Sequence, residues 1–182
     1  LCLNKSEKRT VLEEEFTGTW CGWCPMGIVG MDRCMEQYPD DWIGIAIHND
    51  DYGDYITSND FKPLMNKVSG FPSCFVDRAA DIYPLYVAQN MPKFLQNPSE
   101  AVLRVNAYWN ETQDSIIVIS ETTFNVDRDD APYGVAYVLV GDDINSGTAG
   151  KQSNYLSGQS YSEKDLQEWA AKPSKVTMNY DH

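Results

Sequence analysis

The sequence predicts an α/β domain followed by an antiparallel β region, and three observations support this fold class. Up to residue 98, short apolar runs alternate with segments whose apolar residues recur every three or four positions, as in alternating strands and helices. From Ala101 on, apolar and polar residues alternate one by one, which is typical of antiparallel strands. Two cysteines, Cys21 and Cys24, stand where the first strand gives way to the first helix. We therefore expect one domain over residues 1–98 and a smaller β-rich domain over residues 99–182.

The first domain has the order strand, helix, strand, helix, strand, helix. Trp42–Ile47 is almost continuously apolar, as expected of a buried parallel strand. In the first helix, Ile28, Met31, Met35 and Tyr38 recur at helical spacing, and Cys34 beside them reads as a core thiol. The predicted strands are Val11–Phe16, Trp42–Ile47 and Cys74–Val76, and the predicted helices lie within Pro25–Tyr38, Asn59–Val68 and Tyr83–Gln96.

The second region contains three clear alternating segments, joined by turns. These predicted strands are Val102–Trp109, Ser115–Val126 and Tyr133–Val140. A loop follows over Gly141–Ser160, then a short helix over Glu163–Ala171 and a weak strand over Val176–Tyr180. Because a small meander with one apolar face must bury that face, we expect a cover from other residues or a partner.

The spacing of Cys21 and Cys24 favours redox chemistry. A helix N-terminus carries a partial positive charge and free N–H groups, which stabilise a thiolate. The second thiol follows one turn later on the same face and can close a disulfide ring. A structural disulfide and half of a zinc site are the alternatives, but the other cysteines and the two histidines, His48 and His182, are scattered. We expect no metal and no cofactor.

A second segment, Gly70–Ser73, leads into the strand that begins at Cys74. Pro72 stands at the strand's start, where its missing N–H costs no ladder hydrogen bond. On composition alone, an ordinary trans Phe71–Pro72 bond is the simpler interpretation.

Two motifs in residues 8–98 resemble thioredoxin. The segment from Phe16 to Cys24 is similar to the family's aromatic-x-x-x-Trp-Cys-Gly-x-Cys, and Gly70–Ser73 is similar to its Gly-Ile-Pro-Thr. The resemblance implies a mixed sheet flanked by helices, with Cys21 as the exposed nucleophile and Cys24 as the buried resolving thiol. It also implies that Pro72 is cis and packs beside the disulfide. The substrate-contacting residues implied in this way are Trp20, Gly22, Trp23, Phe71 and Pro72.

Glu15 falls at the position of the thioredoxin family's buried acid, which implies a role in removing the proton from Cys24. The alternative is an exposed strand residue beside Glu13 and Glu14. Gly22-Trp23 stands where thioredoxin has Gly-Pro, and this pair tunes the reduction potential. The oxidising or reducing direction therefore stays open.

Val11–Pro25 also resembles the opening of a bacterial family of outer-membrane-associated lipoproteins, in which an Ig-like β domain follows a thioredoxin-like domain. Gln152–Tyr155 is similar to a segment of that family's C-terminal domain. The resemblance implies a periplasmic or outer-membrane location. Because an Ig-like sandwich needs about seven strands, we expect residues 99–182 to form an incomplete one, and the chain to be a fragment of a longer lipoprotein.

The net charge of the chain limits the classes of partner that it is expected to bind. Fourteen basic and 27 acidic residues give a net charge of −13, which argues against nucleic acid and anionic membrane surfaces. No apolar run reaches the roughly 18 residues of a membrane span, so we expect membrane association only through a lipid anchor outside this chain. Cys2 is expected to be an ordinary thiol, because Leu1 before it fits an anchor site poorly.

His48 ends the Trp42–Ile47 strand, and Cys21 follows the end of the first strand. If the two strands are parallel, both residues lie at one sheet edge, where α/β proteins place their sites. His48 would then tune the thiolate or shuttle a proton, and a polar residue closing a strand is the simpler alternative.

Two functions follow from these observations. The first is a cell-envelope thiol–disulfide oxidoreductase acting on protein disulfides, with an unknown redox partner. The second is a non-enzymatic surface lipoprotein or binding module that keeps a thioredoxin scaffold.

Overall fold

The computed structural model describes residues 9–49, 51–127, 129 and 133–180. These residues fall into two compact units. One unit contains the described residues of 10–95 together with those from 138 on, and the other contains Arg9 and the described residues of 96–137. The predicted C-terminal domain, residues 99–182, is thus divided between the two units.

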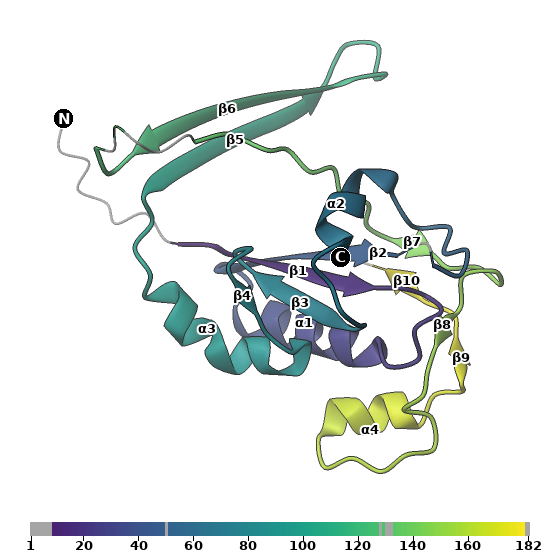
Figure 1. The fold of residues 1–182 in the computed structure, drawn as a ribbon. Coiled ribbons are helices and arrows are strands. Elements are labelled where there is room, and N and C mark those ends of the chain that lie inside the picture. Colours follow the sequence, from purple (N-terminus) through teal and green to yellow (C-terminus); the bar gives the residue numbers. More distant parts are fainter. Residues whose placement is uncertain (1–8, 50, 128, 130–132, 181–182) are drawn as a thin grey trace. The chain divides into compact units, whose positions relative to one another are not determined.

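The first unit is built on a four-stranded mixed sheet with the order β2-β1-β3-β4 (Figure 1). The central strand β1 (Val11–Thr17) runs parallel to β2 (Trp42–His48) and antiparallel to β3 (Ser73–Val76), which pairs with β4 (Ala80–Asp81). This arrangement is compatible with a thioredoxin-like domain. The three predicted strands of this domain agree with β1, β2 and β3 to within a residue at each end.

Helix α1 (Pro25–Gln37) starts directly after Cys24, as predicted, because a proline is tolerated in the first helical turn. Two short 3₁₀ turns, η1 (Asn59–Phe61) and η2 (Pro84–Tyr86), lead into α2 (Lys62–Met65) and α3 (Val87–Leu95). The predicted helix over Asn59–Val68 is therefore shorter than expected. Helices α1 and α3 lie along one face of the sheet (Figure 1), and the apolar core between them includes Met31, Cys34, Val76 and Met91.

The C-terminal segment packs on α1 in the same unit. Helix α4 (Lys164–Ala170) buries Leu166 and Trp169 against Val29 of α1 and against Leu156. Arg33 of α1 donates two hydrogen bonds to Asp165, at 2.5 and 2.9 Å. Short strand pairs connect the rest of this segment: β8 (Gln152–Ser153) with β9 (Lys175–Val176), and β7 (Ile144–Asn145) with β10 (Asn179–Tyr180).

The second unit is a β-hairpin of β5 (Ala101–Trp109) and β6 (Ile116–Phe124). The predicted third strand, Tyr133–Val140, is wrong: among the described residues, this segment forms no strand pairing. Within this unit, Tyr133 stacks on Phe124 and Tyr137 hydrogen-bonds to Ser120, so side chains rather than a backbone ladder hold it. The described residues from Ala101 on form three separate two-stranded pairings and no seven-stranded sandwich. The Ig-like fold stays a prediction.

Candidate functional site: a disulfide in an aromatic groove

Cys21 and Cys24 are joined by a disulfide at the N-terminus of α1. Their Cα atoms are 5.4 Å apart, and the Cys24 carbonyl oxygen accepts the first helical hydrogen bonds, from Gly27 and Ile28. Cys21 is 5% exposed and Cys24 is fully buried. The more accessible sulfur is thus the one that the thioredoxin resemblance assigns as the nucleophile.

A groove of about 480 Å³ opens beside Cys21. Its walls are aromatic, and the described residues that line it carry no charge: Trp20, Cys21, Gly22, Trp23, Tyr52, Phe71 and Tyr155. Trp20 makes edge-to-face contacts with Tyr52 and Phe71, and Trp23 makes one with Tyr155. Such a groove can accept an apolar segment next to the sulfur of Cys21.

Four of the five predicted substrate-contacting residues, Trp20, Gly22, Trp23 and Phe71, line this groove. The Phe71–Pro72 peptide bond is cis, as the resemblance implies. Contact between Pro72 and the disulfide stays a prediction. The sequence reasoning did not assign Tyr52 and Tyr155 to the site, although Tyr155 closes the segment that resembles the lipoprotein family.

Glu15 is buried on β1, which excludes the alternative of an exposed strand residue. Burial raises the pKa of its carboxyl group well above the ordinary value, and the negative charge of Glu13 raises it further, while a hydrogen bond with Thr17 lowers it. Its Oε1 atom has no hydrogen-bond partner among the described residues. Glu15 also lines a cavity of about 210 Å³ together with residues of α1, α4 and the C-terminal segment. Such a carboxyl group holds its proton more tightly than an ordinary glutamate does.

The neighbouring glutamates, Glu13 and Glu14, are each bound by other side chains of the domain. Arg78 forms a bidentate ion pair with Glu14, with N–O distances of 2.7 to 3.0 Å. Glu13 accepts a hydrogen bond of 2.8 Å from Trp42 Nε1 and one of 3.4 Å from Cys74 Sγ. Burial raises the pKa of Cys74 and of Cys34, so both core thiols stay protonated and unreactive.

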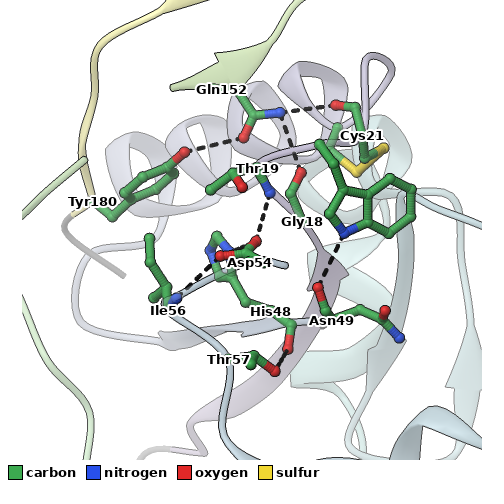
Figure 2. A network of polar contacts seen from close by, with 12 residues as sticks. Gly18, Thr19, Cys21, His48, Asn49, Asp54, Ile56, Thr57, Gln152 and Tyr180 are labelled. Atoms are coloured by element: carbon green, nitrogen blue, oxygen red, sulfur yellow. Dashed lines mark hydrogen bonds and ion pairs between the residues drawn. A yellow bond between two sulfur atoms is a disulfide. The ribbon is translucent and has the colours of Figure 1, made fainter. Parts of the chain in front are cut away.

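His48 is buried at the end of β2, and its Nδ1 atom lies 2.8 Å from Asp54 Oδ2. Burial alone would raise the pKa of Asp54, but hydrogen bonds from His48 and from the N–H groups of Thr19 and Ile56 lower it. His48 is not among the lining residues of the groove at the disulfide. His48 is connected through Asp54 to residues 18–24, the segment before α1 that we call the redox loop: Asp54 accepts a hydrogen bond of 2.7 Å from the Thr19 N–H (Figure 2).

The segment Gln152–Tyr155 lies directly on the redox loop. The N–H of Ser153 donates to the Thr19 carbonyl at 2.7 Å, and the N–H of Tyr155 donates to the Gly22 carbonyl at 2.8 Å. The ring of Tyr155 covers Gly22 so closely that a β-carbon at Gly22 would overlap it. This glycine is therefore required by the close approach of a segment that is distant in the sequence.

No protein-family model matches the sequence, and no curated protein matches it. Among solved structures, the chain is similar to HBP35 of Porphyromonas gingivalis, with 22% identity and a TM-score of 0.42 over 55% of this chain and 37% of that one. It is also similar to a structural-genomics protein of Agrobacterium tumefaciens, with 13% identity and a TM-score of 0.44 over 59% of this chain and 55% of that one. The chain thus spans about a third to a half of the length of these proteins.

The described residues contain no cluster of three or more His, Cys, Asp and Glu side chains that could hold a metal ion. In the part of the chain that the structure describes, no helix is both long and apolar enough to cross a bilayer.

Proposed function

We propose that this protein is a thiol–disulfide oxidoreductase that acts on protein disulfides. The observation that carries the proposal is the Cys21–Cys24 disulfide, which stands at the start of α1 beside an aromatic groove. A helix N-terminus stabilises a thiolate there, and the groove offers apolar surface to a peptide next to the reacting sulfur.

In the reducing direction, the Cys21 thiolate attacks one sulfur of a substrate disulfide. The substrate S–S bond breaks, a Cys21–substrate S–S bond forms, and the other substrate sulfur leaves as a thiolate. Cys24 then gives up its proton and attacks Cys21 Sγ, which releases the second substrate thiolate and closes the Cys21–Cys24 bond. Two electrons and two protons pass in total from the dithiol to the substrate. The oxidising direction is the same sequence reversed.

We assign Glu15 as the group that takes the proton from Cys24. Its carboxyl group lies against Gly27 of α1, three residues after Cys24. The raised pKa of Glu15 supports this role, because a carboxylate with a raised pKa accepts a proton more readily than an ordinary one does. His48 acts indirectly. It holds the Asp54 carboxylate in place, and Asp54 in turn binds the backbone N–H of Thr19.

We further propose that the protein works in the periplasm or at the outer membrane, with a separate redox partner that recycles it. The resemblance to outer-membrane-associated lipoproteins supports this location. Any membrane association would then depend on a lipid anchor, and the net charge of −13 argues against nucleic acid as a ligand.

The decisive experiment measures reduction of a protein disulfide, such as that of insulin, in the presence of a dithiol reductant. We expect turnover by the wild-type protein and none by Cys21→Ser. Cys24→Ser should accumulate a mixed disulfide through Cys21, because the resolving thiol is missing. Cys34→Ala, which removes a buried thiol of the same helix, is the matched control and should retain turnover.

A non-enzymatic binding module is the second candidate, and the low exposure of Cys21, 5%, favours it. In that case the dithiol would have a potential far below that of the cell envelope, and no variant or condition would give turnover.

A further inference from the structure

A continuous series of contacts between buried residues connects two positions of the redox loop, Thr19 and Cys21 (Figure 2). It begins where the Thr19 N–H donates to Asp54, and it continues through the hydrogen bond between Asp54 and His48. The His48 ring packs edge to face on Tyr180, with centroids 5.2 Å apart. The Tyr180 hydroxyl donates to Gln152 Oε1 at 3.1 Å, and Gln152 Nε2 donates to the Cys21 carbonyl at 2.8 Å.

In this series of contacts, Gln152 is the residue that binds Cys21 directly, through the Cys21 carbonyl oxygen, and it is fully buried. Besides the Cys21 carbonyl, its Nε2 atom reaches the carbonyl oxygens of Ser153 at 3.0 Å and of Gly18 at 3.4 Å. Its Oε1 atom at the same time accepts a hydrogen bond from Tyr180. Only a primary amide can donate to several carbonyls and accept from a phenol in this way; a carboxylate cannot donate.

The bond from Gln152 belongs to a larger set that fixes the loop. Backbone N–H groups of Ser153 and Tyr155 bind the carbonyls of Thr19 and Gly22. Four carbonyl oxygens of the loop therefore accept hydrogen bonds from the segment Gln152–Tyr155: those of Gly18, Thr19, Cys21 and Gly22. The loop conformation depends on donors that lie more than a hundred residues away in the sequence.

We propose that Gln152 is a positioning residue of the redox pair, which holds the Cys21 backbone where its sulfur meets that of Cys24 and so favours the disulfide over the dithiol. The physical reason is conformational entropy. When the disulfide is reduced, the covalent restraint on the loop is lost, and only the hydrogen bonds keep the two sulfurs together. Without the hydrogen bonds from Gln152, the redox loop of the dithiol form samples more conformations. Forming the disulfide then requires a larger loss of conformational entropy. The inference rests on the proposed function only in that it concerns the same pair of thiols.

The test is the equilibrium of the protein with glutathione, in which the disulfide and two glutathione thiols convert to the dithiol and glutathione disulfide. For Gln152→Ala we expect the constant for disulfide formation to fall about tenfold, the size of one or two buried hydrogen bonds. For a two-electron couple this raises the reduction potential by about 30 mV. Gln152→Glu keeps the acceptor for Tyr180 but loses the donors, and should shift the potential in the same direction.

Two further variants separate positioning from general stability. Tyr180→Phe keeps the ring on His48 but removes the hydroxyl that orients Gln152, and should give part of the shift. Gln159→Ala removes an exposed amide that donates to the Tyr155 carbonyl and does not touch the loop, and should leave the potential unchanged. A merely structural role would destabilise the oxidised and reduced forms equally and would not move the potential.

The inference is overturned if Gln152→Ala and Gln152→Glu both equilibrate within twofold of the wild-type protein. If either variant fails to fold, the other and Tyr180→Phe decide. Because glutathione replaces the protein substrate, this measurement does not depend on enzymatic turnover. A shifted potential without reduction of insulin would support this inference and refute the proposed function.

Discussion

Glu15 and Gly27 face each other between β1 and α1, so closely that a β-carbon on Gly27 would overlap the Glu15 carboxyl group. A glycine in a helix interior costs about 1 kcal/mol relative to alanine. Here it provides the space in which a buried acid reaches the helix that Cys24 begins. A buried Glu15 on β1 in this conformation therefore requires a residue without a side chain at position 27.

Gly27→Ala is expected to displace the Glu15 carboxyl group and to destabilise the protein by about 1–3 kcal/mol, because the buried carboxyl group has no room to move. The change is measured as the free energy of unfolding in urea. Gly70→Ala is the matched control, because a β-carbon there meets no atom within 4 Å. Equal effects of the two substitutions would contradict the close contact.

Glu15→Gln is expected to become more stabilising as the pH rises. The pKa of Glu15 is raised in the folded protein, so the folded state binds this proton more tightly than the unfolded state does. The stability that this contributes is complete below the unfolded pKa of about 4.3 and is lost as the pH rises through the folded pKa. Glutamine does not titrate and avoids the loss.

Urea unfolding of the oxidised protein at about pH 5 and pH 8 measures this difference. Glu36→Gln, at an exposed position of α1, is the control and should show no such trend. A stability difference between Glu15→Gln and wild type that is the same at both pH values would show that Glu15 titrates normally.

Cys21 is expected to be the first thiol to be alkylated in the reduced protein, with a pKa below the model-peptide value of about 8.5. The reason is its position at the N-terminus of α1 and beside the groove. Iodoacetamide labelling as a function of pH, mapped by mass spectrometry, gives the pKa. Cys34, in α1, is an internal control and should react slowly, because burial raises its pKa. A Cys21 pKa of 8.5 or more would refute the assignment.

Asp54→Asn is expected to destabilise the protein by about 2 kcal/mol at neutral pH, because a buried ionised acceptor loses its charge-assisted bonds to His48 and Thr19. The pKa of Asp54 is lowered in the folded protein, so its contribution is present above the unfolded pKa of about 3.9 and is lost as the pH falls through the folded value. The difference from wild type should therefore shrink towards pH 3.

His48→Ala tests the other half of the pair. If His48 acts through Asp54, this variant lowers the rate of disulfide exchange and shifts the pKa of Cys21 in the same direction as Asp54→Asn does. Unchanged values of both quantities would leave His48 as a polar residue that closes β2.

Tyr155→Ala is expected to weaken exchange with a protein disulfide several-fold through a higher KM, since one wall of the groove is lost. Exchange with a small disulfide reagent should change much less. Tyr86→Ala is the control, because Tyr86 is similarly exposed, 54% against 59%, and contacts Tyr83 instead. If KM for the protein substrate is unaffected, Tyr155 does not contact the substrate.

Local sequence patterns predicted the α/β elements and the position of the cysteine pair. Strands β1, β2 and β3 and helix α1 follow from local periodicity and from a proline after Cys24, which are properties of neighbouring residues. Trp20, Gly22 and Trp23 lie beside the disulfide because they are adjacent to it in the chain, although it was the thioredoxin resemblance that assigned them as substrate contacts. Phe71 came from the thioredoxin resemblance, not from a local pattern.

The surroundings of these residues depend on contacts between distant parts of the chain, which local patterns did not predict. The alternation over Tyr133–Val140 predicted a strand, but a strand also needs a partner backbone, which a local pattern cannot specify. Likewise, Asp54 and Gln152 bind the redox loop across 35 and 131 positions, and Tyr155 joins the groove from the same distant segment. Hydrogen bonds and packing between such distant positions leave no periodicity in the sequence, so they appear only when the C-terminal segment docks on α1 and on the loop before it.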